Sequence, residues 1–255
     1  MPRLPVTPWD VRVISRAAAV GALAFVLAWL LTAATDEGDV AWAERVGRTL
    51  PLVPVCSALG AWAALAPATA RGEILALAAL GRSRAQSVAA AVAGGSLVAL
   101  AASIALVTAH RIDAGGFFPT IARSDAWRWD GHGFVDLVHG LVVGPRGEIE
   151  KVTAGNGPSE AILERFPSHA RAAAAIAVAL AGVALPLLLA HAMVARPDPR
   201  LARSEARSIF ACAAAIAATI LLFQAAASRH VPALLGAVPP ALLLGLAVQR
   251  YRAAP

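Results

Sequence analysis

Six apolar runs, each of about 20 residues, constrain the fold of this chain more than any other feature. A helix of that length spans the hydrocarbon core of a bilayer, because each residue adds about 1.5 Å along the helix axis. Hydrophobic residues make up 58% of the chain and charged residues 15%, whereas soluble domains carry about 25% charged residues. The sequence therefore predicts an all-α polytopic membrane protein with six transmembrane helices. The runs cover residues 15–34, 50–69, 86–109, 171–194, 208–227 and 231–249.

The arginines predict the orientation of these helices. They concentrate in both termini and in the loops after the second and fourth runs, and cytoplasmic loops are rich in Lys and Arg. These residues are Arg3, Arg12, Arg16, Arg71, Arg82, Arg84, Arg196, Arg200, Arg203, Arg207, Arg250 and Arg252. We therefore expect both termini to be cytoplasmic. The net charge of +6 comes in short clusters rather than on one continuous face, so nucleic acid is not an expected partner.

The runs divide the chain into two halves of three helices each, separated by a long segment on the outer side. We expect an N-terminal transmembrane half at 1–109, a small β-rich outer module at 110–169 and a C-terminal transmembrane half at 170–255. Gly94 and Gly182 lie within the runs and predict close helix packing, because small residues let helix backbones approach in lipid. A genome that favours Ala and Gly codons is the alternative explanation.

The outer segment has the sequence pattern of a hairpin. FVDLVHGLVV (134–143) and EIEKV (148–152) are rich in β-branched or alternating apolar residues, and GPRG (144–147) supplies a turn. We expect one β-hairpin here, with a further strand near 126–129. In NGPSEAILERF (156–166), a serine before an apolar-periodic run predicts a short helix.

The six runs carry no Asp, Glu, Lys or Arg deep inside them, and His191, near the end of the fourth run, is the nearest exception. Ion-coupled transporters place such residues within the membrane as relays. The sequence also has no HExxH, GxSxG or GxxxxGK[ST] motif. We therefore expect a non-catalytic protein without a cofactor, which would depend on another polypeptide for energy.

Four polar residues in the outer segment could ligate a metal ion: Asp130, His132, Asp136 and His139. On a strand, His132 and Asp136 would share one face and His139 would lie on the other. Polar residues on a solvated hairpin explain the pattern better, so we predict no metal site and keep His132 and His139 as weak candidates.

The segment RGEILALAALGRSR (71–84) lies between the second and third runs. It has strong helix formers, with Ile74, Leu77 and Leu80 at helical spacing and a glycine that would end the helix. Glu73 lies near the start, where a negative charge suits the helix dipole. The pattern predicts a short amphipathic helix at the cytoplasmic surface that docks another protein. An ordinary interfacial turn is the alternative.

The stretch at 50–86 resembles the lipopolysaccharide-export permease family (LptF/LptG), in which a proline-bearing second span leads into a motif close to SE-L-AL-A-G-S. Arg71, Glu73, Leu77, Gly81 and Ser83 occupy the matching places. The same motif is similar to the coupling helices of other ABC permeases. The final span, 230–252, and the order of three spans, outer β module and three spans are also similar to that family. The chain thus resembles a diverged member with a shortened periplasmic domain.

This resemblance implies a transmembrane permease subunit of an ABC-type lipid exporter, in the bacterial inner membrane, for a lipopolysaccharide-like cargo. The implied partners are a cytoplasmic ABC ATPase dimer, a second permease subunit in a homo- or heterodimer, and a periplasmic bridge protein. The residues expected to contact the ATPase are Arg71, Glu73, Ile74, Leu77, Leu80, Gly81 and Ser83. Arg45 and Arg48 are candidates for contact with a lipid headgroup.

Two alternatives remain open. The chain could be a mechanotransmitting ABC permease like FtsX or MacB, although those proteins usually have four spans with the outer domain after the first. It could also be a non-transporting membrane scaffold whose 71–84 segment is a plain interfacial helix. Charge reversal at Glu73 should separate the scaffold from the two ABC interpretations.

Overall fold

The computed structural model describes residues 6–35, 42–109, 112, 114–118, 127–129, 134–136, 141–144, 147–151, 169–194, 199–228 and 230–253. Its helices are α1 (Pro8–Thr35), α2 (Trp42–Thr49), η1 (Leu50–Leu52), α3 (Val53–Ala70), α4 (Glu73–Ala79), α5 (Arg84–Thr108), α6 (Ala170–Val194), α7 (Pro199–Ala227), η3 (Ala233–Ala237) and α8 (Val238–Ala253). Within these residues, six helices are long and apolar enough to cross a membrane. The prediction of six helices long and apolar enough to span a membrane is confirmed, and these helices indicate a multi-pass membrane protein.

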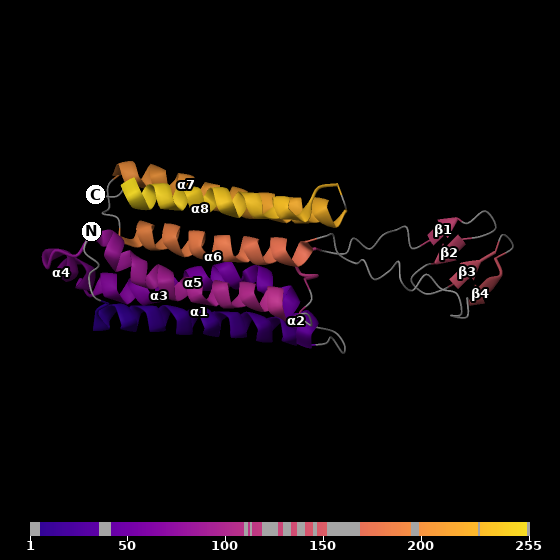
Figure 1. The fold of residues 1–255 in the computed structure, drawn as a ribbon, viewed down its shortest axis with the longest axis horizontal. Coiled ribbons are helices and arrows are strands. Elements are labelled where there is room, and N and C mark those ends of the chain that lie inside the picture. The colour runs from indigo at the N-terminus through magenta and orange to yellow at the C-terminus, as the bar shows by residue number, and fades with distance from the viewer. Residues whose placement is uncertain are drawn as a thin grey trace.

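The spanning helices run side by side in one bundle (Figure 1). α6 packs against α3 and α5 on one side and against α8 on the other, and α1 packs on α3 and α5. α7 makes most of its contacts with α8 and η3. The start of α1, the end of α8 and the short helix α4 all lie at the same end of the bundle (Figure 1). An even number of spans requires both termini to lie at the same end of the bundle. The structure shows that α4 lies at that end as well.

Small residues bring the central helices into backbone contact. A Cβ added at Gly94 would overlap the carbonyl oxygen of Ile14 in α1, and one at Gly182 would overlap the Cβ of Ala99 in α5. Larger side chains at these positions would force the helices apart. The glycines therefore have a packing role, as the close-packing interpretation predicts.

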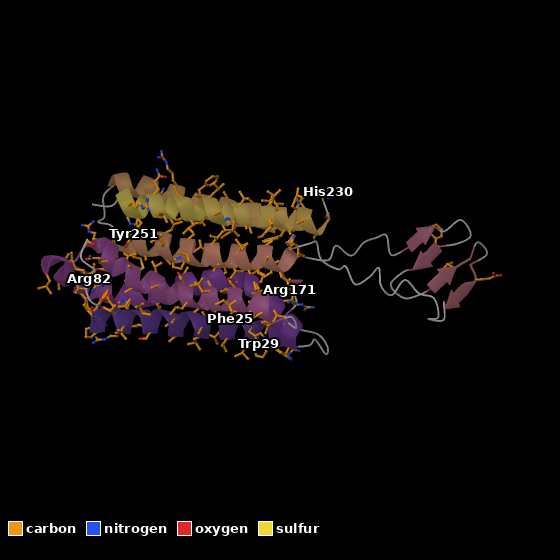
Figure 2. The ribbon with its side chains drawn as sticks, viewed as in Figure 1. Phe25, Trp29, Arg82, Arg171, His230 and Tyr251 are labelled. Atoms are coloured by element: carbon orange, nitrogen blue, oxygen red, sulfur yellow. The ribbon has the colours of Figure 1, made fainter. Side chains whose placement is uncertain are left out.

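At the opposite end of the bundle, aromatic contacts and hydrogen bonds from Arg171 hold the helix ends together. Phe118 packs edge-to-face on Phe223, with ring centroids 5.1 Å apart. The guanidinium of Arg171 donates to the carbonyl oxygens of Ala109, at 3.3 Å, and Ile112, at 2.5 Å. Ala109 is the C-cap of α5, and its carbonyl also accepts from the amide of Ile112 at 3.0 Å. Arg171 and His230 lie at this end, whereas Arg82 and Tyr251 lie at the end with α4 (Figure 2).

Four short strands lie beyond this second end of the bundle (Figure 1). They are β1 (Trp127–Trp129), β2 (Phe134–Asp136), β3 (Leu141–Val143) and β4 (Ile149–Lys151), paired antiparallel in chain order. The prediction of one strand over 134–143 is wrong, because Phe134 pairs with Val143 and Asp136 with Leu141. The stretch folds back on itself, which an apolar β-branched run does not reveal.

A β-rich module with a core of its own is not supported. Each strand has only three residues. Of the two strand side chains that the structure describes, Phe134 is exposed and Val143 is half-buried. Strands of this length bury too little apolar surface to stabilise a module alone. The predicted helix at 156–166 and the weak metal candidates His132 and His139 lie outside the described residues.

Candidate functional site

The segment predicted to dock a partner forms a separate seven-residue helix, α4, between two glycines in left-handed conformation. Gly72 has φ +71° and Gly81 has φ +85°, a region that L side chains rarely adopt. After the last turn, the amide of Arg82 donates to the carbonyl of Leu77 at 3.0 Å, and the amide of Gly81 donates to Ala78 at 3.0 Å. This pattern is a Schellman motif. Each glycine lets the chain turn sharply, so α4 is not continuous with α3 or α5.

The residues of α4 divide between an anchor and an exposed face. Ile74 is 7% exposed and belongs to the hydrophobic cluster that contains Val13 and Leu65. Leu75 and Leu80 are 69% and 83% exposed. The predicted apolar face of Ile74, Leu77 and Leu80 is therefore not one surface, because Ile74 faces the bundle. Helical spacing identifies apolar positions but does not say which of two sides the bundle covers.

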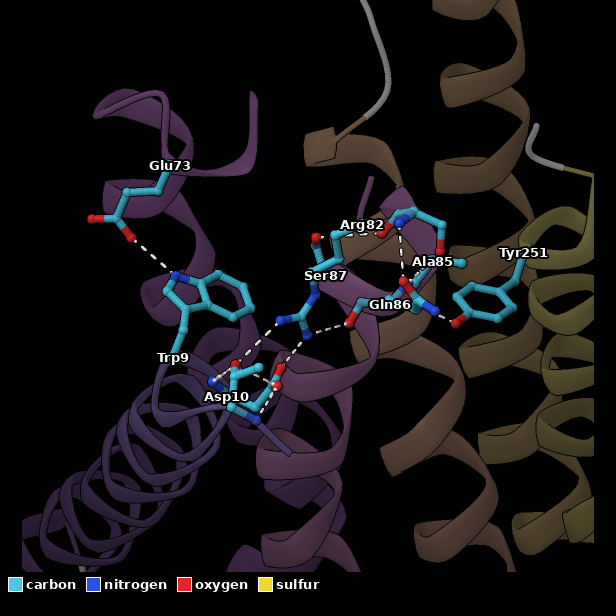
Figure 3. A network of polar contacts seen from close by, with 10 residues as sticks. Trp9, Asp10, Glu73, Arg82, Ala85, Gln86, Ser87 and Tyr251 are labelled. Atoms are coloured by element: carbon cyan, nitrogen blue, oxygen red, sulfur yellow. Dashed lines mark hydrogen bonds and ion pairs between the residues drawn. The ribbon is translucent and has the colours of Figure 1, made fainter. Parts of the chain in front are cut away.

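Glu73, at the start of α4, accepts from two other residues, and Figure 3 shows its contact with Trp9. The indole Nε1 of Trp9 donates to Glu73 Oε2 at 3.1 Å, and Nε of Arg71 donates to Glu73 Oε1 at 2.6 Å. The bond from Arg71 and then the bond from Trp9 lower the pKa of the Glu73 carboxyl below its ordinary value. Glu73 therefore remains a carboxylate at neutral pH and links α4 to the first turn of α1.

Arg82, just after α4, makes an ion pair with Asp10 in the first turn of α1. The two side chains are 14% and 12% exposed. The guanidinium also donates to the carbonyl of Gln86 at 3.2 Å and lies 4.9 Å from the centre of the Trp9 ring. A cation over an aromatic face is attracted to it. Trp9 and Asp10 thus contact both ends of α4.

A capping box holds Asp10 in place. Thr7 is the residue before α1, and its amide donates to Asp10 Oδ2 at 2.9 Å while the amide of Asp10 donates to Thr7 Oγ1 at 3.3 Å. Pro8 occupies the first helical position, where its missing amide hydrogen is not needed. The predicted first span, 15–34, begins later than this helix. The pattern Thr-Pro-x-Asp is the signal that would have found it.

Ser83 has a structural role at the start of α5. Its side chain accepts from the amide of Gln86 at 3.2 Å, and the Gln86 side chain accepts from the amide of Ser83 at 3.0 Å. The hydroxyl of Tyr251 in α8 donates to the carbonyl of Ala85 at 2.8 Å. α5 therefore begins at a fixed position relative to the end of α8, next to the end of α4.

Arg45 and Arg48, the candidates for a lipid headgroup, belong to α2. Arg45 is half-buried and Arg48 is exposed. α2 lies at the end of the bundle opposite α4 (Figure 1). The structure therefore does not bring these arginines together with the α4 residues, and the two candidate sites are separate.

The chain was compared with protein families, curated proteins and solved structures, and none of them matches it. The geometry around α4 is therefore the basis for a functional proposal. Trp9, Asp10, Gln86 and Tyr251 also belong to this site and were not predicted from the sequence. All four lie close to arginines that predicted only the orientation of the helices.

Proposed function

We propose that this protein is the transmembrane subunit of an ABC-type lipid exporter and that α4 docks on a cytoplasmic ATPase. The observation that supports the proposal most directly is the exposed apolar face of α4. Leu75 and Leu80 are exposed together with Ala76 and Ala79. Leu75 and Ala79, like Ala76 and Leu80, are four residues apart and so share one side of the helix. An amphipathic helix of this kind binds in a groove of a partner protein.

The charges at this end of the bundle favour a cytoplasmic location for α4. Six described arginines lie near the α4 end of their helices: Arg12, Arg16, Arg84, Arg207, Arg250 and Arg252. The short helix α2, at the other end, carries Arg45 and Arg48. Cytoplasmic surfaces of membrane proteins carry the excess of positive charge. With this orientation, α4 would be accessible to a cytoplasmic partner.

The way in which α4 is held also fits a docking element. Ile74 packs into the bundle, and the contacts of Glu73 and Arg82 hold both ends of the helix. A pre-ordered docking helix loses little conformational entropy when it binds. The sequence has no P-loop motif, so the nucleotide would be hydrolysed by the partner.

The lipid cargo and the second permease subunit are the finer parts of the proposal, and the resemblance to the lipopolysaccharide-export permeases supports them. In this arrangement two permease subunits enclose the lipid, and closure of the ATPase dimer expels it toward the periplasmic side. The chain itself performs no chemistry in this mechanism. Its contribution is to convert the movement of α4 into a change in the space between two subunits.

The test is purification of the tagged full chain in a gentle detergent, with identification of co-purified proteins by mass spectrometry. We expect an ABC ATPase with the wild type, and its loss with Leu75→Asp and Leu80→Asp, because a charge on the exposed face would be buried in the partner's groove. Both side chains are exposed, so the variants should fold.

Val6→Asp is the matched control. Val6 is also an exposed aliphatic residue at this end of the bundle, but it precedes α1. It should retain the ATPase. Glu73→Lys is a less selective variant than the sequence suggests, because it would also break the contact with Trp9. Absence of an ATPase from the wild-type preparation would contradict the proposal and favour a membrane scaffold.

A further inference from the structure

The first turn of α1 contacts α4 at both ends of the short helix, and this arrangement has a mechanical consequence. We propose that Trp9 and Asp10, together with Glu73 and Arg82, form a clamp that transmits displacement of α4 to α1. We call these four residues the α4 clamp. The inference rests on the proposed function, because the displacement would come from the docked ATPase. It assigns positioning roles to residues on α1 that contact neither ATPase nor cargo.

One contact of the clamp involves the first residue of α4, and the other involves a residue that follows α4 in the chain (Figure 3). Trp9 Nε1 donates to Glu73 at the first residue of α4, at 3.1 Å. Asp10 pairs with Arg82 immediately beyond the last turn of α4. Arg82 lies beyond α4, but its amide donates to the carbonyl of Leu77 in α4, so a displacement of α4 strains both contacts unless α1 moves as well.

The backbone connections of α4 differ at its two ends, because the Schellman motif at Gly81 joins Arg82 to the last turn of α4. Gly72 and Gly81 join α4 to α3 and α5, and at neither glycine would an added Cβ meet another atom within 4 Å. Glycine has no side chain to restrict its dihedral angles. The Asp10–Arg82 pair is largely shielded from water, where the attraction between charges is stronger than at an exposed surface. A displacement of α4 would therefore reach α1 through the side chains of the clamp, in addition to the packing of Ile74 against the bundle.

α1 is well suited to receive this displacement. It is one continuous helix from Pro8 to Thr35, about 42 Å long at 1.5 Å per residue, and the capping box joins Asp10 to its first turn. In its most apolar stretch, 11% of residues are buried inside the bundle, against 56% in α6. α1 also packs closely on α3 and α5, so a shift of α1 would be passed on to those helices. Movement at the α4 end would thus reach the opposite side of the membrane.

The decisive experiment measures movement of α1 in the assembled complex. Spin labels on cysteines at Leu31 in α1 and Ile176 in α6, both exposed, report the distance between the far ends of these helices. Cys56 and Cys212 are replaced by Ala in this background. We expect the distance to change when ATP and vanadate are added to the wild type with its co-purified ATPase.

In Asp10→Ala and Trp9→Phe the ATPase should still co-purify, but the nucleotide-dependent distance change should be lost or strongly reduced. Trp9→Phe keeps an aromatic ring under Arg82 and removes only the donor to Glu73. Asp10→Glu keeps the charge and should restore the change. An undiminished distance change in Asp10→Ala with the ATPase bound would overturn the clamp while leaving the proposed function intact.

A second measurement does not depend on the ATPase. Asp10→Ala should raise amide hydrogen exchange in α4 and in the first turn of α1 by roughly ten- to a hundredfold, the range for loss of a hydrogen bond to a charged group. Ser15→Ala is the control, since the Ser15 hydroxyl bonds only to the carbonyl of Arg12 within α1. Unchanged exchange in α4 would refute the clamp. No ATPase with the wild type would refute the proposed function instead.

Discussion

At the scale of single residues, the α4 end of the bundle depends on a few charged and aromatic side chains. Asp10 and Arg82 are both largely buried, and each is the other's counterion. Removing one member of such a pair leaves a charge without a partner in a poorly solvated place, which costs more than removing both. Asp10 also accepts from Thr7, so its loss would weaken the start of α1.

Arg82→Gln should lower the free energy of unfolding by about 3 kcal/mol, the size found when one partner of a buried ion pair is removed. The double variant Asp10→Asn with Arg82→Gln should lose less than the sum of the single losses, because neither charge is then left alone. Thermal unfolding of the four proteins in one detergent checks this. Additive losses would show that the pair contributes no coupling energy.

The Trp9–Glu73 contact should weaken in acid. The folded-state pKa of Glu73 lies below its ordinary value of 4.5, so the contact is fully stabilising above that pH and is lost as the pH falls through the lower, folded-state pKa. The fluorescence difference between wild type and Trp9→Phe, followed from pH 7 to pH 3, isolates the Trp9 signal. A signal that does not change below pH 4.5 would contradict the prediction. In Glu73→Gln the transition should be absent.

At the scale of secondary-structure elements, glycines control both the packing of the long helices and the independence of α4. In α5, Gly94 faces the backbone of α1, and in α3, Gly60 lies against the carbonyl of Ala17. Neither neighbour can move like the end of a flexible side chain. In contrast, Gly245 in α8 has no atom within 4 Å of the position of an added Cβ.

Gly94→Ala should destabilise the bundle by about 1–3 kcal/mol, because the added methyl group overlaps backbone atoms of α1. Gly245→Ala is the matched control. It should be neutral or stabilising by up to about 1 kcal/mol, since Ala favours the helical state more than Gly does. Thermal unfolding in detergent measures both. Equal stability of the two variants would mean that α1 does not pack on α5 as closely as described.

At the scale of the whole molecule, the bundle separates two different ends. One end carries α4, both terminal helix ends and most of the described arginines (Figure 1). The other carries α2 and the aromatic contact of Phe118 with Phe223, and the four short strands lie beyond it. If the bundle crosses a membrane, these ends lie in different compartments, which separates any partner of α4 from any partner of the sheet.

Labelling of single cysteines should reveal this separation. In a background without Cys56 and Cys212, a membrane-impermeant maleimide added to intact spheroplasts should label a cysteine at Glu148, beside β4, and should label one at Leu80 only after the membrane is opened. Both positions are exposed. Labelling of Leu80→Cys from outside would reverse the orientation and contradict a cytoplasmic partner for α4.

The six apolar helices, the short helix at 73–79 and the start of α1 at Pro8 follow from local patterns, because apolar run length, glycine positions and capping residues act over a few neighbouring residues. The division of α4 into a buried Ile74 and an exposed Leu80 depends on which helix lies alongside. The pairing of Asp10 with Arg82, 72 residues apart, is the clearest case. Only the packing of α1 against α5 brings these two charges together, since no local pattern couples residues so distant in the chain.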